Sequence, residues 1–222
     1  MPYAALEEPT RLFVLRHGQT AWNAQARIQG HLDMPLNAVG RWQAERLAKA
    51  LQGEELAAVY ASDLARARET AEPLARCLQL PVVMDLRLRE RHFGRFEGQT
   101  YEDIEATWPE EAARWRQRDP DFGPGGGERL IDFYERSVQA ATLLARRHPG
   151  RTIALVAHGG VLDCLYRAAL GIDLQVPRSW PVANAVINRL LWTPQGLSML
   201  SWHDAAHLEG VAGDEPPPAD TP

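Results

Sequence analysis

The sequence predicts an α/β protein, folded as a single-domain three-layer α/β/α sandwich around a mostly parallel central sheet. Short apolar runs of strand length alternate along the chain with longer segments whose apolar residues recur at helical spacing. Two of these runs end at a histidine followed by glycine, at His17 and at His158. A chain of 222 residues with 45% hydrophobic and 24% charged content can bury one substantial core.

The first half of the chain contains three strand candidates, at residues 11–16, 57–61 and 82–84. Between the first two, residues 37–51 have helical spacing and Gly53 can end the helix. After the second strand, Ser62 or Asp63 is expected to cap a helix that extends to Leu78. The order strand then helix therefore occurs twice.

Residues 100–118 predict one polar-faced helix that buries Ile104, Trp108 and Trp115. A segment rich in proline and glycine follows and predicts an exposed connection, which lacks the Lys-Ser/Thr pair of a nucleotide-binding loop. The remaining elements are a long amphipathic helix, the clearest strand of the chain, a further helix and two strands, at residues 129–147, 152–157, 161–170, 185–192 and 197–202.

Composition excludes several classes of function. A net charge of -5 and a pI near 5.8 give no basic face for nucleic acid. The sequence shows neither a secretory leader nor an apolar run long enough to cross a membrane, so we expect a cytoplasmic protein without a membrane partner. Cys77 and Cys164 have no metal-binding spacing and are expected to be reduced, buried thiols.

The ends of two predicted strands indicate where the chemistry lies. Parallel sheets bind ligands beyond the carboxyl ends of their strands, and both His17 and His158 fall there. If these two strands are neighbours in the sheet, the two imidazoles face one another across a pocket.

Five sequence blocks then carry a family resemblance. Residues 15–23 (Leu-Arg-His-Gly-Gln-Thr-Ala-Trp-Asn) resemble the arginine-histidine-glycine motif of the histidine phosphatase superfamily, which includes cofactor-dependent phosphoglycerate mutases. Four further blocks agree in order, at residues 30–37, 62–71, 88–98 and 157–160. The resemblance implies a histidine phosphatase domain over residues 11–210, preceded by an extension of residues 1–10. Residues 211–222 are expected to be a disordered tail because of their composition.

The resemblance also implies a set of catalytic residues. His17 is expected to attack phosphorus and become phosphohistidine, while Arg16 and Arg66 bind the phosphoryl oxygens. Glu90 matches the family's acid-base carboxylate, and His158 is expected to donate to the transferring phosphoryl group. The remaining positions implied to bind the substrate are Asn23, Gln29, Gly30 and Gly159. The reaction is expected to need neither a metal ion nor a cofactor.

Other charged and aromatic residues have simpler interpretations. Arg68, Arg89 and Arg91 are interpreted as surface or flanking charge. His203 and His207 have the spacing of a helical metal pair but lack a third ligand, so a metal role is not favoured. Three residues, Trp108, Trp115 and Arg118, are compatible with either the pocket or helix packing.

The resemblance leaves the fate of the phosphoryl group open between water and a second hydroxyl. Three departures from the mutases favour a phosphatase: Gln19 replaces their usual glutamate, Gly160-Val161 replaces Asn-Ser, and residues 97–129 form a shorter stretch. A shorter covering exposes the intermediate to water. We therefore expect a phosphomonoesterase for a small phosphorylated metabolite, in a monomer or homodimer; a mutase and a non-catalytic phospho-ligand or partner-binding domain are the alternatives.

Overall fold

The computed structural model describes residues 8–209 and 216–217. Residues 1–7 of the predicted extension, and all of the predicted tail except 216–217, therefore lie outside the described residues. The helices and strands follow in chain order: β1 (Thr10–Arg16), α1 (Ala21–Ala24), α2 (Ala38–Ala50), β2 (Leu56–Ala61), α3 (Ala65–Cys77), β3 (Val82–Met84), α4 (Tyr101–Thr107), α5 (Pro109–Arg116), α6 (Leu130–Ala145), β4 (Thr152–Ala157), α7 (Gly159–Leu170), β5 (Ile187–Thr193) and β6 (Gly196–Asp204).

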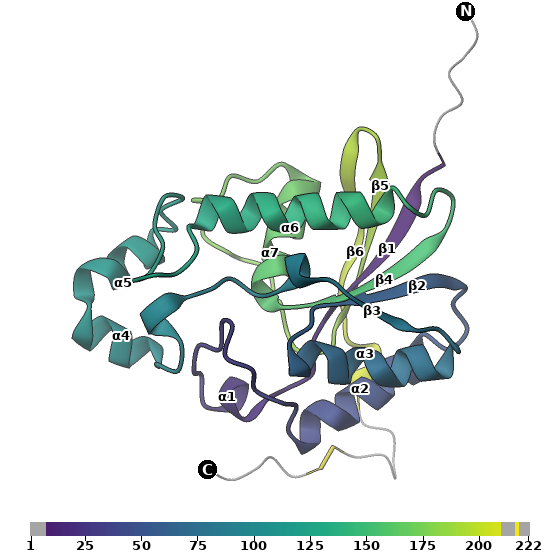
Figure 1. Ribbon diagram of the computed structural model, residues 1–222, viewed down its shortest axis with the longest axis horizontal. Helices are drawn as coiled ribbons and strands as arrows, with labels where there is room; N and C mark the ends of the chain where they lie inside the picture. Colours follow the sequence, from purple (N-terminus) through teal and green to yellow (C-terminus); the bar gives the residue numbers. More distant parts are fainter. Residues whose placement is uncertain (1–7, 210–215, 218–222) are drawn as a thin grey trace, which may run out of the picture.

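The strands form one mixed, mostly parallel sheet in the order β3-β2-β4-β1-β5-β6 (Figure 1). The four strands from β3 to β1 are parallel, whereas β5 runs antiparallel to β1 and β6 antiparallel to β5. Since a parallel connection needs a crossover, helices separate the parallel strands along the chain. The predicted α/β sandwich is confirmed.

Alternation along the central strand β1 divides the core between the two faces of the sheet. Leu12 and Val14 pack with α6 and α7 on one face. Phe13 and Leu15 pack with α2 and α3 on the other. Because successive side chains of a strand point to opposite faces, a strand covered on both sides is apolar throughout, as residues 12–15 are.

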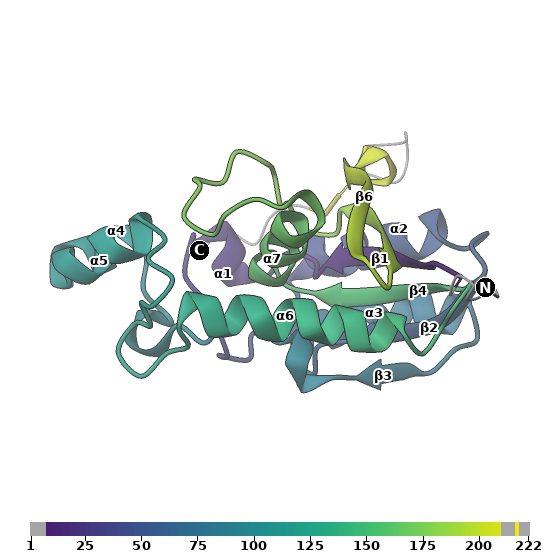
Figure 2. The same cartoon turned by 90° about the horizontal axis from the view of Figure 1, so that it is seen from above.

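The predicted helix over residues 100–118 is instead two helices, α4 and α5, joined at Trp108. Pro109 has no N–H to continue the α4 hydrogen-bond ladder and excludes helical backbone from the residue before it, so Trp108 adopts φ -135° and ψ 64°. Both helices project to one side of the sandwich, beyond the carboxyl ends of the parallel strands (Figure 2). Ile104 is buried as expected, and the half-buried Trp108 and Trp115 pack around Phe96 in a small separate core.

Two smaller expectations are wrong. Neither Ser62 nor Asp63 caps α3, whose N-cap is Leu64 and has no side-chain hydrogen bond; Asp63 binds Arg89 instead. Cys77 is exposed, although Cys164 is buried as predicted. His203 belongs to β6 and His207 to the short turn after it, so the two histidines do not share a helix.

No helix within the described part of the chain is both long and apolar enough to cross a membrane.

Candidate active site

The pairing of β1 with β4 brings the two histidines together. In this parallel pair Arg16 lies opposite Ala157, so the residues that follow, His17 and His158, leave the sheet side by side. Their ring centroids are 5.2 Å apart, and the two side chains are buried, with 3% and 0% exposed. The strands that precede the two histidines are therefore neighbours, which was the condition for the imidazoles to face one another.

One hydrogen bond sets the tautomer of His17. Its Nδ1 lies 2.7 Å from the carbonyl oxygen of Gly18, which can only accept, so Nδ1 carries the proton and Nε2 carries the lone pair. Burial lowers the pKa of His17 well below its usual value, and the positive charges of Arg66 and Arg16 add to this effect. The imidazole is therefore neutral and has an available nucleophilic nitrogen at neutral pH.

The loop that carries His17 is packed directly on the backbone of α2. A Cβ on Gly18 would overlap the carbonyl of Gly40, and a Cβ on Gly40 would overlap the carbonyl of Gln19. Further hydrogen bonds hold the loop: the Gly18 N–H donates to Thr70 Oγ1 of α3 at 2.9 Å, and the Asn37 N–H donates to the Gln19 carbonyl at 3.0 Å. Contacts with two helices thus fix the position of His17.

Arg66 organises the site from the first turns of α3. Its Nε donates to His158 Nδ1 at 3.2 Å, while its two terminal nitrogens donate to the carbonyls of Leu32 and Gly30 at 2.9 and 2.7 Å. Because His158 Nδ1 accepts, its Nε2 carries the proton, and this Nε2 has no hydrogen-bond partner among the described residues. His158 can therefore donate to a phosphoryl oxygen.

The two arginines stay charged despite their burial. Desolvation lowers the pKa of both Arg16 and Arg66 to about 10, with the Glu90 carboxylate acting in the opposite direction. Arg16 donates through Nη1 to the carbonyl of Val182, and its buried Nε has no partner among the described residues. Two positive charges beside a neutral histidine form an anion-binding site.

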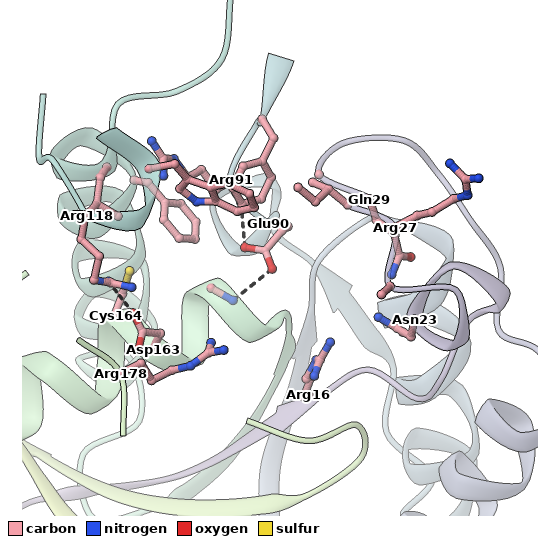
Figure 3. Close-up of a pocket in the computed structure, with 18 of the residues that line it drawn as sticks. Arg16, Asn23, Arg27, Gln29, Glu90, Arg91, Arg118, Asp163, Cys164 and Arg178 are labelled. Carbon is pink, nitrogen blue, oxygen red and sulfur yellow. Dashed lines mark hydrogen bonds and ion pairs between the residues drawn. The ribbon is translucent and has the colours of Figure 1, made fainter. Parts of the chain in front are cut away.

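Glu90 faces this site from the loop before α4. Its Oε2 accepts from the Gly160 N–H at 3.0 Å and its Oε1 from the Arg91 N–H at 2.8 Å (Figure 3). A Cβ on Gly160 would overlap the Glu90 carboxylate and approach the Phe133 ring to 2.9 Å. Gly160, which replaces an asparagine of the mutases, therefore makes room for the Glu90 carboxylate.

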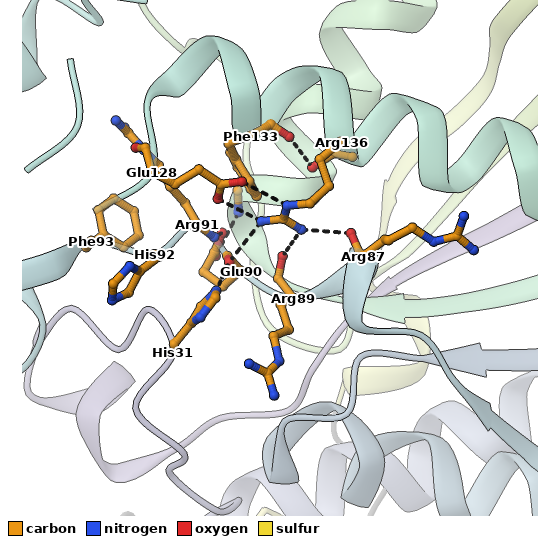
Figure 4. Close-up of polar contacts among 12 residues, drawn as sticks. His31, Arg87, Arg89, Glu90, Arg91, His92, Phe93, Glu128, Phe133 and Arg136 are labelled. Atoms are coloured by element: carbon orange, nitrogen blue, oxygen red, sulfur yellow. Dashed lines mark hydrogen bonds and ion pairs between the residues drawn. The ribbon is translucent and has the colours of Figure 1, made fainter. Parts of the chain in front are cut away.

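A second arginine network holds the backbone around Glu90 (Figure 4). Arg136 of α6 donates to the carbonyls of Arg87 and Arg89 at 2.8 and 3.0 Å and binds the Glu128 carboxylate. The Glu90 carbonyl accepts from His31 Nε2 at 2.9 Å. The position of the carboxylate is thus set by contacts from three separate segments.

Four of the predicted catalytic residues, Arg16, His17, Arg66 and Glu90, line one cavity of about 660 Å³ together with Asn23, Gln29 and Gly30. His158 is fully buried and is not among the lining residues. Asn23 Oδ1 accepts hydrogen bonds from the Thr20 backbone N–H and from Asn184 Nδ2. The side-chain N–H groups of Asn23 are therefore left for the cavity. Gln29 is buried, and its Oε1 has no hydrogen-bond partner in the part of the chain that the structure describes. Gly159 lies behind Arg16 and does not line the cavity.

The comparisons with known proteins agree with this geometry. Residues 12–205 match the family model described as the histidine phosphatase superfamily (branch 1).

This chain belongs to the histidine phosphatase superfamily.

The relatives of this histidine phosphatase include proteins named as mutase-like and proteins named as phosphatases, the two activities that the sequence left open. The chain is 41% identical to phosphoglycerate mutase-like protein 4 of Arabidopsis thaliana, over 89% of this chain and 86% of the relative. It is 37% identical to the metal-independent phosphoserine phosphatase of the same plant, over 92% and 85% of the two chains. The solved structure of Bacillus stearothermophilus YhfR superposes with a TM-score of 0.84 at 35% identity, covering 90% of this chain and all of that one.

The structure corrects one interpretation and adds residues to the site. Arg91 is not flanking charge: it is buried, lines the cavity and donates to the carbonyls of Glu128 and Phe122 at 2.9 and 2.5 Å. Arg89 does lie outside, paired with Asp63, and Arg68 is exposed beside Glu72. Because Arg89 and Arg91 flank Glu90 symmetrically, no sequence pattern separates them.

The sequence predicted few of the residues that line the cavity on the side away from Asn23 and Gln29. Trp115 and Arg118, which the sequence left open, line it, whereas Trp108 stacks on Phe96. Asp163 and Arg178 also line it and carried no signal in the sequence, since they lie in a helix and a loop without a recognisable motif.

The contact between Gly18 and Gly40 gives a first prediction. Gly40→Ala forces the His17 loop away from α2, and a displacement near 1 Å at a reacting atom costs about 100-fold in rate. We expect kcat for an aryl phosphate to fall by about 10- to 100-fold in a protein that still folds, as judged by circular dichroism. Gly53→Ala is the control, because a Cβ there meets nothing within 4 Å. Full activity in folded Gly40→Ala would show that this contact does not set the nucleophile.

The depressed pKa values give a second prediction. Burial and Arg66 lower the pKa of both His17 and His158, so the folded protein keeps these rings neutral where an exposed imidazole, with a pKa of about 6.5, takes up a proton. Nitrogen-detected NMR of the imidazoles should show both rings neutral from pH 8 to pH 6, with His17→Asn assigning the first. The unfolded chain binds more protons below about pH 6.5, so the unfolding free energy must fall as the pH drops through that value. Titration of either ring near pH 6.5 contradicts the assignment.

Proposed function

We propose that this histidine phosphatase is a phosphomonoesterase that hydrolyses a small phosphorylated metabolite through a phosphohistidine on His17. The observation that carries the proposal is the His17 Nε2 lone pair, fixed by the bond from Nδ1 to the Gly18 carbonyl and flanked by Arg16 and Arg66. A neutral nitrogen nucleophile beside two guanidinium groups suits attack on a phosphate ester.

The first step forms the N–P bond and breaks the P–O bond of the ester. Arg16, Arg66 and the Nε2–H of His158 stabilise the charge on the phosphoryl oxygens as it spreads in the transition state. Glu90 acts in this step in its protonated form and gives its proton to the leaving oxygen, which departs as an alcohol. Two hydrogen bonds from backbone N–H groups orient the Glu90 carboxylate for this transfer.

The second step returns the enzyme to its initial state. Glu90, now ionised, takes a proton from water while the water oxygen attacks phosphorus, the N–P bond breaks, and inorganic phosphate leaves with the His17 lone pair restored. In a mutase a substrate hydroxyl would replace this water.

Two features support hydrolysis over transfer. The short stretch between residues 97 and 129 contains α4 and α5, which project to one side of the sandwich (Figure 2), and of these two helices only Trp115 and Arg116 line the cavity. A site with less covering admits water to the intermediate. The second feature is the name of one relative, a metal-independent phosphoserine phosphatase, which supports hydrolysis of a small phosphorylated substrate.

The proposal predicts metal-independent hydrolysis. We expect an aryl phosphate to be hydrolysed in EDTA, and His17→Ala to reduce kcat by at least about 1,000-fold because the covalent route is lost. Two variants on α3 form a matched pair. Arg66→Gln removes a buried positive charge from the site, whereas the control, Arg68→Gln, removes an exposed positive charge that pairs with Glu72. No turnover by the unmodified protein would favour a binding domain.

A second assay separates the two enzymes. With phosphoglycerate and its bisphosphate primer, a phosphatase releases inorganic phosphate faster than it forms the isomer. Predominant isomer formation would identify a mutase and overturn the assignment.

A further inference from the structure

The cavity holds more arginines than one phosphate requires, and most of them already have partners. Arg91 donates to two backbone carbonyls, Arg118 binds Asp163 at 2.7 Å, and Arg116 binds Glu105 at 2.9 Å. Arg27 donates to the Gly98 carbonyl at 2.8 Å. These four side chains hold the walls of the cavity.

Arg178 is different from the other arginines that line the cavity. It has no hydrogen bond and no ion pair to any residue in the described ranges, and it lies in the exposed loop between α7 and β5. Its guanidinium points into the cavity on the side opposite Asn23 and Gln29 (Figure 3). Its charge also contributes to lowering the pKa of Arg16, which places it within electrostatic reach of the phosphate end.

The loop that presents Arg178 is firmly anchored. The fully buried Arg167 donates to the carbonyls of Asp173 and Val176 at 2.5 and 2.9 Å, and Arg118 donates to that of Leu174 at 2.6 Å. Asp163 joins these two arginines, accepting from Arg167 at 3.0 Å and from Arg118 at 2.7 Å. The chain is thus held immediately before Pro177, whose ring further restricts the backbone that leads to Arg178.

The chain is held again directly after Arg178. The Trp180 ring is buried, stacked on Tyr166 with centroids 4.1 Å apart and lying 4.7 Å from the guanidinium carbon of Arg167. An unpaired charge on an anchored loop is preorganised to bind an anion, because little backbone freedom is lost when the anion arrives.

We infer that Arg178 is a specificity-determining residue that binds a carboxylate on the phosphate ester, so the enzyme acts preferentially on carboxylate-bearing phosphomonoesters. This inference rests on the proposed phosphatase function of the same site. A single guanidinium matches the charge and the two oxygens of a carboxylate, whereas a second phosphate dianion would require further unpaired cations. Arg16 and Arg66 are assigned to the phosphate that reacts.

Asp163 adds a hydrogen-bond acceptor on the same side of the cavity. It is 4% exposed, and its Oδ1 has no partner among the described residues, although Oδ2 binds both arginines. A hydroxyl or ammonium group next to the substrate carboxylate can donate to this oxygen. The favoured substrate therefore carries a donor as well as a carboxylate.

A matched pair of substrates isolates the carboxylate. 3-Phosphoglycerate and glycerol 3-phosphate share a phosphate, a three-carbon chain and the central hydroxyl. They differ at one end, where 3-phosphoglycerate has a carboxylate and glycerol 3-phosphate has a CH₂OH group. We expect the unmodified protein to favour 3-phosphoglycerate in kcat/KM, and Arg178→Gln to reduce the ratio of the two kcat/KM values by about 10- to 30-fold, as for a charged hydrogen bond. The ratio cancels any general effect of the variant on folding or on Arg16.

Arg68→Gln is the control for loss of a positive charge and should leave the ratio unchanged, because Arg68 is exposed on α3 away from the cavity. Equal kcat/KM for the two substrates in the unmodified protein, or an unchanged ratio in Arg178→Gln, would overturn the inference, as would failure to hydrolyse either substrate. The aryl phosphate assay with His17→Ala keeps the two proposals separate. If that activity depends on His17 while the ratio does not depend on Arg178, the phosphatase assignment stands and only the specificity assignment falls.

Discussion

The parallel pairing of β1 with β4 is the constraint on which the rest of the site depends. Its register places His17 and His158 next to one another at the carboxyl edge of the sheet, with ring centroids 5.2 Å apart. Each strand is buried on both faces, so a shift in register would expose apolar side chains as well as separate the histidines. The stability of the sheet and the geometry of the proposed nucleophile are therefore set by the same contacts.

Around this pair, the protein offsets the cost of burying charge with backbone carbonyls rather than with carboxylates. Arg66 donates to the carbonyls of Leu32 and Gly30, and Arg16 to that of Val182. A carbonyl stabilises a buried guanidinium but leaves its positive charge available to a ligand. Farther out, Arg118 and Arg167 converge on Asp163 and anchor a loop, and Arg178 on this loop faces the same cavity without a partner among the described residues. The arginines thus divide into those that hold the walls and those proposed to meet the substrate.

Local signals in the sequence predicted the framework of the fold and the centre of the site. The apolar runs ending at His17 and His158 were sufficient to place both residues at one edge, and the structure confirms their contact. Features that depend on contacts distant in sequence were missed: Asp63 binds Arg89 instead of capping α3, and Arg91 is buried while its near neighbour Arg89 is not. The break at Trp108 was predictable from Pro109, because proline restricts the residue before it. The position of Arg178, by contrast, follows from an anchored loop that no local pattern reveals.

The central claim, a phosphoryl group carried on His17, is tested most directly by trapping the intermediate. Glu90→Gln removes the group proposed to activate water but still permits attack on an aryl phosphate, whose phenolate leaves without a proton from the enzyme. Mixing this variant with the aryl phosphate, stopping the reaction in alkali, where phosphohistidine is stable, and mapping the peptides by mass spectrometry should locate one phosphoryl group on His17. Phosphate found on His158 or on another residue, or release of the phenol with no phosphorylated peptide in either the variant or the unmodified protein, would contradict the account.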